Sequence, residues 1–332
     1  MAGIKDIAEA AGVSLSTVSN VINGKRNVGK KTREKVLQLI EEMDYVPNEA
    51  GKLLKTKENH TILFVFSDFD RSFYLEVLKG VNDYLKNKDY DLLICTQRSC
   101  EKYMRNNMSS GCIVLDAALC DDTILRCANE NYPIVALDRT CASPYVRSVI
   151  VDNYPAMCEM MQDIIDRGYR RFAFLSGVET SLDNMERYRG FSDTIEKNGL
   201  HFHQKNYFVG DYREESGYTV GKILSLAENL PDALICANDN MAIGAIKAFR
   251  ENNIRVPEDI AVTGFDDIER AQEIGLTTIT VPDYERGYLA ALYLMEALNG
   301  KDVAKTFQIS PKVKMRKTVL VKKTKTRSKI VK

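Results

Sequence analysis

The sequence predicts an α/β protein in which a small N-terminal helical domain precedes a two-lobed core built on parallel sheets. Three short segments with apolar residues at helical spacing occupy residues 4–43. Beyond Thr61, short apolar runs alternate with amphipathic segments, a pattern typical of a parallel sheet with helices on both faces. About ten such runs exceed one compact sheet, so we expect two Rossmann-like lobes with a cleft between them.

The first helix is predicted over residues 4–11, "IKDIAEAA". Its apolar side chains recur at positions i, i+3, i+4 and i+7, which places them on one helix face. Gly12 follows as a glycine able to end the helix in the left-handed conformation. Ser14 is then a good N-cap for a second helix, predicted from about Leu15 to Ile22.

A third helix is predicted to begin near Lys31 or Thr32 and to run to Met43, with Pro47 preventing its continuation. Two short helices joined by a glycine-containing turn and followed by a third form a helix-turn-helix unit. The bend before the third helix, "NGKRNVGKK", is basic.

The core contains seven clear apolar runs, which we predict to be buried strands: "ILFVF", "DLLIC", "GCIVLD", "PIVALD", "RRFAFLSG", "DALICAND" and "IAVTGFDD". Segments between them, such as "YLEVLKGVNDYLKNK" and "MAIGAIKAFRENN", have helical spacing. Ligands of parallel sheets bind beyond the carboxyl ends of the strands. Polar residues follow these ends at Asp68, Asp138, Asn238, Asp239, Asp266 and Asp267.

Charge is distributed unevenly although the chain is neutral as a whole. Residues 1–60 carry 10 basic and 8 acidic residues, and residues 312–332 carry 10 basic residues and no acidic ones. The body, residues 61–311, carries 26 basic and 38 acidic residues. Such a chain attracts an anionic polymer with its ends and repels it with its body.

The number and spacing of the cysteines and histidines argue against a metal site and against an exported protein. The eight cysteines form no CxxC pair and only three histidines are present, His60, His201 and His203, so a zinc site is not expected. Most cysteines lie in apolar runs and resemble small buried side chains of a reducing cytosol. No signal peptide or apolar stretch of about 18 residues occurs, so we expect a cytoplasmic protein without cofactor.

The motifs together resemble the LacI/GalR family of bacterial transcriptional regulators. The headpiece "IKDIAEAAGVSLSTVSNVINGKRNVGKKTREKVLQLIEEMDYVPNEA" carries the resemblance in the first part of the chain. The body contributes "VALDRT", "VIVDN", "RGYRRFAFLSG", "RYRGF", "ICANDNMAIGAI", "VTGFDD" and "LTTI", in this order. A lone helix-turn-helix is a weak signal, whereas an ordered set of motifs over most of the chain is a strong one.

The resemblance implies a division of the chain into four parts. Residues 1–46 form a helix-turn-helix DNA-binding headpiece, and residues 47–60 form a hinge helix and linker. Residues 61–321 form a two-lobed, periplasmic-binding-protein-like core for effector binding and dimerisation, and residues 322–332 form a basic disordered tail. The implied protein is a homodimeric regulator, with repression expected, that binds a palindromic operator and is switched by a small effector.

The family's DNA contacts correspond to residues of the second helix and its flanks. Leu15, Ser16 and Asn20 match the base-reading positions, and an amide such as that of Asn20 can pair with adenine. The family commonly has arginine at the position of Asn20, so the operator is expected to differ there; a merely solvated Asn20 is the alternative. Backbone-phosphate contacts are implied for Ser14, Thr17, Ser19, Asn27, Thr32 and Arg33. Ser14 and Thr32 can equally be helix caps.

Leu54 matches the family's hinge leucine, which inserts as an apolar wedge into the minor groove at the operator centre. Gly51 stands where the family commonly has alanine, which lowers the helix propensity of the hinge by about 1 kcal/mol. Simple packing of Leu53 and Leu54 is the alternative interpretation.

Six residues of the core match positions that line the family's effector cleft: Phe73, Asp138, Arg187, Tyr212, Asn238 and Asp266. Carboxylates, an amide and a guanidinium beside aromatic rings suit a polyol, so a sugar or sugar phosphate is the expected effector. Asp138 has an alternative, structural role beside Arg139, and Tyr74 and Asn153 are weaker candidates.

Three departures from the family pattern bear on the effector. Ser181 stands where a purine-binding member would have a second arginine, which argues against a purine. Arg71 and Ser72 replace the frequent Asn-Pro, and the added cation favours an anionic ligand such as a sugar phosphate. The segment 97–110 is short, which predicts a truncated helix in the first lobe.

Other functions are less well supported by the sequence. No GxGxxG, P-loop, GxSxG or metal pattern occurs, so an enzyme is not expected. An unregulated sugar-binding protein would not need the headpiece. A DNA-binding regulator controlled by a protein partner, or without an effector, remains the main alternative.

Overall fold

The computed structural model describes residues 3–46, 59–67, 69, 71–96, 99–106, 108–116 and 119–322. The chain forms two compact units, residues 1–59 and residues 60–332, and each is described by itself. Within the part that the structure describes, every helix is too short or too polar to cross a membrane.

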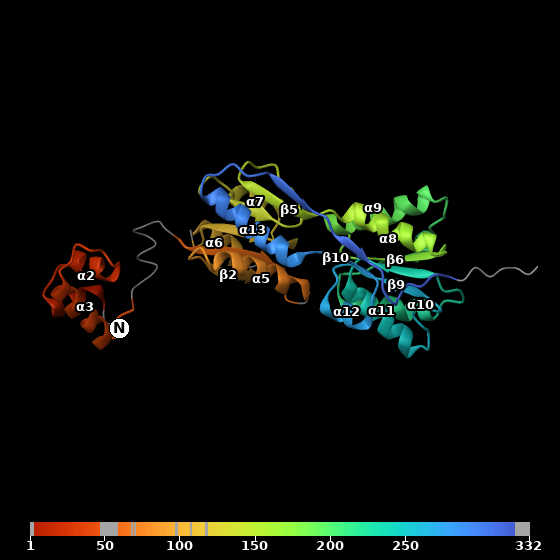
Figure 1. The fold of residues 1–332 in the computed structure, drawn as a ribbon, viewed down its shortest axis with the longest axis horizontal. Coiled ribbons are helices and arrows are strands. Elements are labelled where there is room, and N and C mark those ends of the chain that lie inside the picture. Colours follow the sequence, from red (N-terminus) through yellow and green to blue (C-terminus); the bar gives the residue numbers. More distant parts are fainter. Residues whose placement is uncertain are drawn as a thin grey trace, which may run out of the picture. The chain divides into compact units, whose positions relative to one another are not determined.

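The described residues 3–46 of the first unit form a bundle of three helices (Figure 1): α1 Ile4–Ala11, α2 Leu15–Ile22 and α3 Lys30–Glu42. The bounds predicted for α1 and α2 are confirmed, and local signals mark the end of α1 and the start of α2. Gly12 has a φ of 68°, and the Ser14 Oγ accepts the backbone N–H of Thr17 at 3.2 Å. The core of the bundle consists of Ile7, Ala8, Ala11, Val18, Val21 and Val36.

The start of α3 differs from the prediction. The helix begins at Lys30, and its N-cap is Gly29, which contributes no side-chain hydrogen bond. Thr32 therefore lies inside the first turn, and the alternative that Thr32 caps the helix is wrong. The helix also ends at Glu42, well before Pro47, so the proline does not determine its end.

Lobe 1 of the second unit is built on a six-stranded sheet in the order β11-β5-β4-β3-β1-β2, with every neighbouring pair parallel. Helices α5 and α13 pack on one face of the sheet, and the short helices α6 and α7 pack on the other. The strands are β1 Thr61–Phe66, β2 Asp91–Thr96, β3 Gly111–Val114, β4 Ile134–Ala136, β5 Val146–Val151 and β11 Thr306–Ile309. The helices are α5 Phe73–Leu85, α6 Cys100–Arg105, α7 Asp121–Cys127 and α13 Asp283–Leu298.

The six residues of α6 agree with the truncated helix expected from the short segment 97–110. Cys100 and Met104 are its buried side chains, and they pack under β1 and β3.

Lobe 2 is built on a four-stranded parallel sheet in the order β7-β6-β8-β9. Its strands are β6 Phe172–Ser176, β7 Tyr207–Val209, β8 Ala233–Cys236 and β9 Ala261–Thr263. Its helices are α8 Asn153–Asp166, α9 Leu182–Lys197, α10 Glu214–Ser225, α11 Asp239–Glu251 and α12 Glu269–Ile274, with a 3-10 turn at Gln204–Asn206. An antiparallel pair, β10 Thr278–Thr280 and β12 Lys312–Lys314, completes the lobe.

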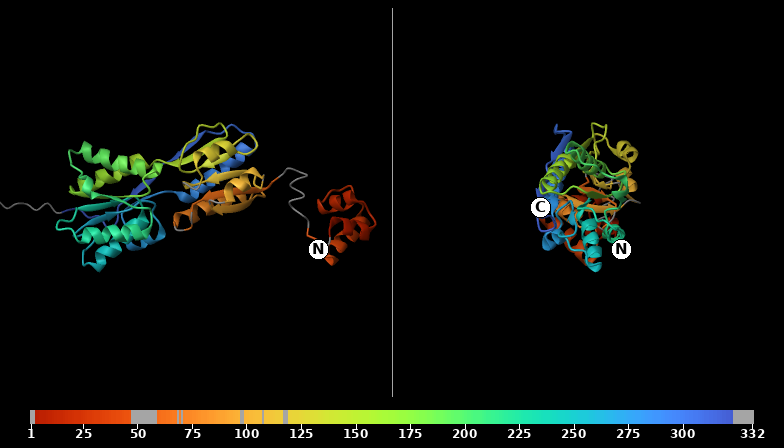
Figure 2. Two further views of the ribbon diagram at one scale, coloured as in Figure 1. Left: turned by 180° about the vertical axis from the view of Figure 1, so that it is seen from behind. Right: turned by 90° about the vertical axis from the view of Figure 1, so that its right-hand side faces the viewer.

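The two lobes lie end to end within the second unit and share three connections (Figures 1 and 2). The chain passes from β5 to α8 near Asp152, returns from β10 to α13 near Pro282, and passes from β11 to β12 near Ser310. Because β5 leads directly into α8, the carboxyl end of a lobe 1 strand faces lobe 2. The α/β fold with two lobes and parallel sheets is therefore confirmed.

Two predicted segments fall wholly or mostly outside the described residues. Residues 47–58, with the hinge and Leu54, are one of them, and residues 323–332 of the tail are the other. Lys322, assigned to the tail, belongs to the ordered core instead: its Nζ lies 2.7 Å from an Asp232 carboxylate oxygen, and its backbone N–H bonds to the Arg167 carbonyl.

Candidate functional site

The exposed face of α2 carries the side chains assigned to base reading. Leu15 is 44% exposed, Ser16 is exposed beside it, and Asn20 is half-buried about one turn further on. Val18 and Val21 point into the core of the bundle. Among the described residues, no hydrogen bond involves the Asn20 side chain, so the bundle does not use its amide.

The hydroxyl groups at the start of α2 form a capping network. The Ser14 Oγ lies 2.8 Å from the Ser16 Oγ and 2.8 Å from the Thr17 Oγ1, besides accepting the Thr17 backbone N–H. Capping by Ser14 is confirmed. It leaves a second contact possible, because a hydroxyl both donates and accepts hydrogen bonds.

The remaining phosphate candidates surround the bend between α2 and α3. Asn27 is exposed in the bend, while Ser19 and Thr32 are half-buried on the adjoining helices. The Arg33 Nη2 donates to the backbone carbonyl of Lys25 and so fixes the bend to α3. These groups border the exposed face of α2, as contacts to a nucleic-acid backbone beside base-reading residues require.

All six effector candidates line one cavity of about 370 Å³ between the lobes: Phe73, Asp138, Arg187, Tyr212, Asn238 and Asp266. They come together because the carboxyl ends of β4, β8 and β9 lead to Asp138, Asn238 and Asp266. Lobe 1 contributes Phe73 from the start of α5, and lobe 2 contributes Arg187 from α9.

Arg187 holds three segments of lobe 2 together beneath the cavity. Its Nε donates to the Asn153 Oδ1 at 2.9 Å, and its Nη1 donates to the Ala237 carbonyl at 2.6 Å. The same Nη1 lies 3.7 Å from the Asp266 carboxylate, and the guanidinium carbon is 3.6 Å from the centre of the Phe265 ring. A guanidinium fixed on this many partners is preorganised for contact with a ligand.

Tyr212 and Asn238 line the same cavity and are bonded to each other. The Asn238 Nδ2 donates to the Tyr212 carbonyl at 2.9 Å, and its Oδ1 accepts the Met241 backbone N–H as the N-cap of α11. The amide of Asn238 is thus used by the fold, with a spare lone pair for a ligand. The Tyr212 ring packs against Gly177, where a Cβ atom would lie 2.0 Å from it, so only glycine fits there.

Asp138, which lobe 1 contributes to the cavity, pairs with its neighbour Arg139. The Arg139 Nη2 lies 2.8 Å from one Asp138 oxygen, and the Arg139 Nη1 reaches Asp121 at 2.9 Å. Burial raises the pKa of the Asp138 carboxyl even though Arg139 opposes the shift. The structure thus supports the structural role of Asp138 while keeping it on the cavity wall.

Burial also raises the pKa of two further cavity carboxyls. The pKa of Asp266 rises to about 6 because burial outweighs the attraction of Arg187. The pKa of Asp283 rises to about 7 for the same reason, against the neighbouring Arg286. Both groups exchange protons near neutral pH.

The charged cavity residues that were not predicted from the sequence include Asp183, Asp283 and Arg286, besides Asp116 and Asp121 of lobe 1. Asp183 lies in the first turn of α9, and Asp283 and Arg286 lie in the first turn of α13, directly after the second connection between the lobes. Asp283 and Arg286 could have been predicted from the charged first turn of α13, because this turn directly follows a connection between the lobes.

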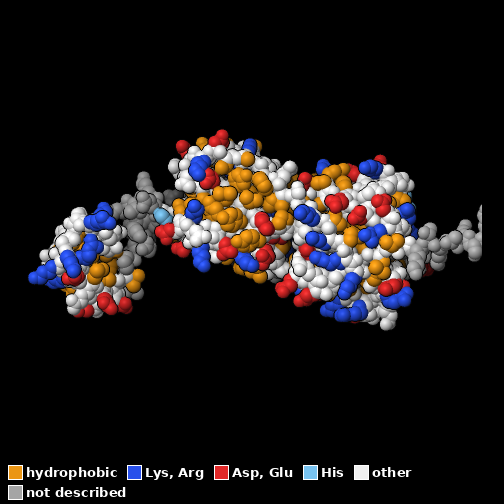
Figure 3. All heavy atoms as spheres, in the orientation of Figure 1, with side chains coloured by type: hydrophobic (Ala, Val, Ile, Leu, Met, Phe, Trp, Pro, Cys, Tyr) orange, Lys and Arg blue, Asp and Glu red, His pale blue; other side chains and the backbone are white. Residues whose placement is uncertain are grey.

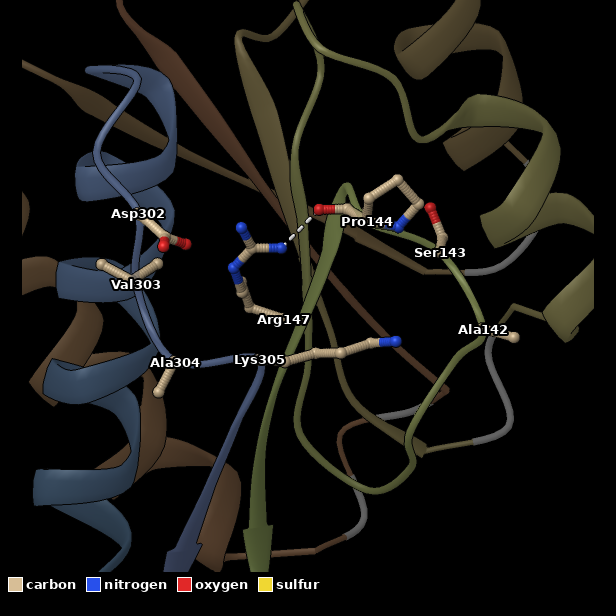
Figure 4. A pocket seen from close by; sticks show the side chains of 8 residues that line it. All are labelled: Ala142, Ser143, Pro144, Arg147, Asp302, Val303, Ala304 and Lys305. Atoms are coloured by element: carbon tan, nitrogen blue, oxygen red, sulfur yellow. Dashed lines mark hydrogen bonds between the residues drawn. The ribbon is translucent and has the colours of Figure 1, made fainter.

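A second hollow, of about 660 Å³, lies at the amino ends of β5 and β11, at the opposite edge of the lobe 1 sheet (Figure 4). It is open to solvent, and it contains none of the predicted effector residues. Arg147, which borders it, donates to the Pro144 carbonyl of its own loop. The interlobe cavity is the better ligand site.

A helix-turn-helix unit joined to a two-lobed core with a polar interlobe cavity defines the class of ligand-responsive DNA-binding regulators. Family models agree in both parts: residues 3–48 match "Bacterial regulatory proteins, lacI family", and residues 161–319 match "Periplasmic binding protein-like domain". The chain belongs to the LacI family of DNA-binding transcriptional repressors with an effector-binding domain. Members of this family are not enzymes, in agreement with the expectation from the sequence.

Three similar proteins illustrate the relation. The transcriptional repressor PurR of Aliivibrio fischeri strain MJ11 is 33% identical over 334 residues, covering 96% of this chain and 99% of the relative. The lac repressor dimer bound to operator and the anti-inducer ONPF is 26% identical, with a TM-score of 0.79 over 96% and 99% of the two chains. The regulator CelR in complex with cellobiose is 27% identical, with a TM-score of 0.71 over 96% and 100%.

Proposed function

We propose that this repressor binds a palindromic operator as a homodimer and that a sugar-like effector in the interlobe cavity changes its operator affinity. The observation that carries the proposal is the cavity itself. Arg187, Asn238 and Asp266 present planar polar groups beside the rings of Phe73 and Tyr212, an arrangement that suits adjacent hydroxyl groups on a ring. The similarity to a cellobiose-bound regulator supports the same class of ligand.

In this proposal, α2 enters the major groove and Leu54 enters the minor groove at the operator centre. Homodimer formation is supported by the dimeric state of the similar lac repressor and by exposed apolar surface on lobe 1. Figure 3 shows hydrophobic side chains gathered over that lobe. Exposed apolar side chains of lobe 1 include Leu75, Ile94 and Tyr288.

The test is the thermal stability of the purified protein with a panel of sugars, sugar phosphates and nucleosides. A ligand at 100 times its dissociation constant adds about 2.7 kcal/mol to the free energy of unfolding. We expect a sugar to raise the melting temperature and to change affinity for operator DNA. Operator binding without any stabilising ligand would contradict the proposal and favour control by a protein partner or repression without an effector.

Replacing Asn20 with alanine is expected to weaken binding to the preferred operator by about 1–3 kcal/mol and to relax selection at one base pair. The reason is that the free amide of Asn20 lies on the exposed face of α2. A binding selection on randomised DNA measures the effect. Gln38→Ala, which removes an exposed amide from α3, is the matched control. An unchanged base preference for Asn20→Ala would remove Asn20 from the base-reading set.

A further inference from the structure

The interlobe cavity has more negative than positive side chains. Six aspartates line it, Asp116, Asp121, Asp138, Asp183, Asp266 and Asp283. Four arginines line it, Arg71, Arg139, Arg187 and Arg286, and no lysine or histidine is among its described lining residues. Fully ionised, the cavity would hold two more negative than positive charges.

The four arginines are already engaged with carboxylates. Arg71 lies 3.5 Å from Asp116, Arg187 lies 3.7 Å from Asp266, and Arg286 lies 3.4 Å from Asp283, while Arg139 is shared between Asp138 and Asp121. The added cation Arg71, which favoured an anionic ligand from the sequence alone, is therefore neutralised within lobe 1.

Asp183 is the cavity carboxylate that is left without a cation. Among the described residues, no arginine or lysine lies within 4.0 Å of it. Its Oδ1 accepts a hydrogen bond from the Asn153 Nδ2 at 2.7 Å, which leaves its second oxygen and further lone pairs available.

The charge of Asp183 acts on groups from both lobes. It contributes to raising the pKa of Asp138 from lobe 1 and of Asp266 from lobe 2, in each case less than burial does. Burial raises the pKa of Asp266 to about 6 and that of Asp283 to about 7, so both carboxyls hold protons more readily than a carboxyl in water does. A bound positive charge would replace those protons.

We propose that the effector carries a protonated amine beside its hydroxyl groups and that Asp183 pairs with this amine. The inference rests on the proposed function, since it concerns the ligand of the same cavity. A phosphate or carboxylate ligand would add to the negative surplus, and a neutral sugar would leave Asp183 unpaired in a partly buried site. An amino sugar or aminated polyol offers hydroxyl groups to the polar side chains of the cavity and a positive charge to Asp183.

The experiment compares matched ligands by thermal shift and titration calorimetry with the full-length protein. The probes are glucosamine, galactosamine and mannosamine, their parent sugars, their N-acetyl derivatives, which lack the charge, and glucose 6-phosphate. At least one amino sugar is expected to bind, and its parent and N-acetyl forms are expected to bind about 10- to 100-fold more weakly, as loss of a charge-assisted hydrogen bond predicts.

Two variants locate the effect. Asp183→Asn is expected to weaken amino-sugar binding by a similar factor, because the amide keeps the size of the side chain and loses its charge. Asp193→Asn removes the same charge from an exposed position on α9 and is expected to leave binding unchanged.

The outcomes separate the two proposals. Tighter binding of a neutral sugar or of glucose 6-phosphate than of every amine, or amine binding unaffected by Asp183→Asn, would overturn the amine inference and leave a sugar-responsive repressor. Failure of every probe, cationic, neutral and anionic alike, would count against the amine inference and the sugar-binding function together.

Discussion

Replacing Arg187 with alanine is expected to abolish the response to effector while operator binding without effector is kept. The guanidinium bridges Asn153, the Ala237 carbonyl and Asp266, which belong to separate segments of lobe 2. Its removal leaves a buried carboxylate without its cation, at a cost of about 3–5 kcal/mol. The headpiece forms its own core and is not expected to lose its fold with this change.

The measurement is operator affinity by fluorescence anisotropy, with and without a ligand that stabilises the wild-type protein. Binding of effector and binding of DNA are linked, so a variant that no longer binds effector must also lose the change in operator affinity. Arg189→Ala on the same helix, where the guanidinium stacks on Tyr154 at 4.2 Å, is the matched control. Arg187→Lys keeps the charge but loses the planar fork, and so separates charge from geometry.

A wild-type response in Arg187→Ala would remove this residue from the effector site. Circular dichroism and the melting temperature show whether the variant is folded, so that a lost response is not caused by unfolding. If Arg187→Ala is too unstable, Arg187→Lys answers the same question, because it is expected to reduce the response while preserving lobe 2.

The parts of the fold that the sequence predicted are those determined by local chemistry. Gly12 and Ser14 delimit α1 and α2 because each needs only its own neighbours to act. The seven apolar runs became strands because buried parallel strands are apolar on both faces. The start of α3 was misplaced because Gly29 caps it without a side chain that would mark the position.

The strands that were missed depend on distant partners. Five strands have no counterpart among the seven predicted runs. β5 has six residues, whereas β7, β10, β11 and β12 have three or four residues each, and β11 is exposed along most of its length. Such short segments carry no periodic signal and become strands only because a neighbouring strand supplies the hydrogen bonds. β11, for example, pairs with β5, which lies far from it in the chain.

The candidate site shows the same division. Asp138, Asn238 and Asp266 follow strand ends, and the topology of a parallel sheet brings such residues to one edge. Asp183 and Asp283 reach the cavity from helix starts, and their approach depends on how the lobes meet. Nor did the sequence show that Asn238 caps α11 and supports Tyr212, which limits what its amide offers a ligand.

The second large effect is expected from Gly287→Ala in α13. Gly287 crosses α5 so closely that a Cβ atom there would lie 1.9 Å from the Val77 carbonyl oxygen. Gly80 of α5 faces α13 in the same way, with a Cβ position 2.0 Å from the Tyr284 carbonyl oxygen. These obstacles are backbone atoms, so the helices must separate, and we expect a loss of about 3 kcal/mol or more in the free energy of unfolding.

Chemical denaturation measures that loss, and Lys79→Ala is the control, since it changes an exposed neighbour of Gly80 whose surface ion pair contributes little. Unchanged stability of Gly287→Ala would mean that the helices are farther apart than described.

The substitution should also act on function, because Gly287 directly follows Arg286 on the cavity wall. The Arg286 Nη2 donates to the Leu137 carbonyl of lobe 1, and the Arg286 Nη1 faces Asp283 beside the connection between the lobes. A shift of α13 away from α5 would displace both groups from the ligand. Folded Gly287→Ala protein is therefore expected to bind effector more weakly than wild type, whereas a change in stability without any change in ligand binding would show that α13 supports lobe 1 alone.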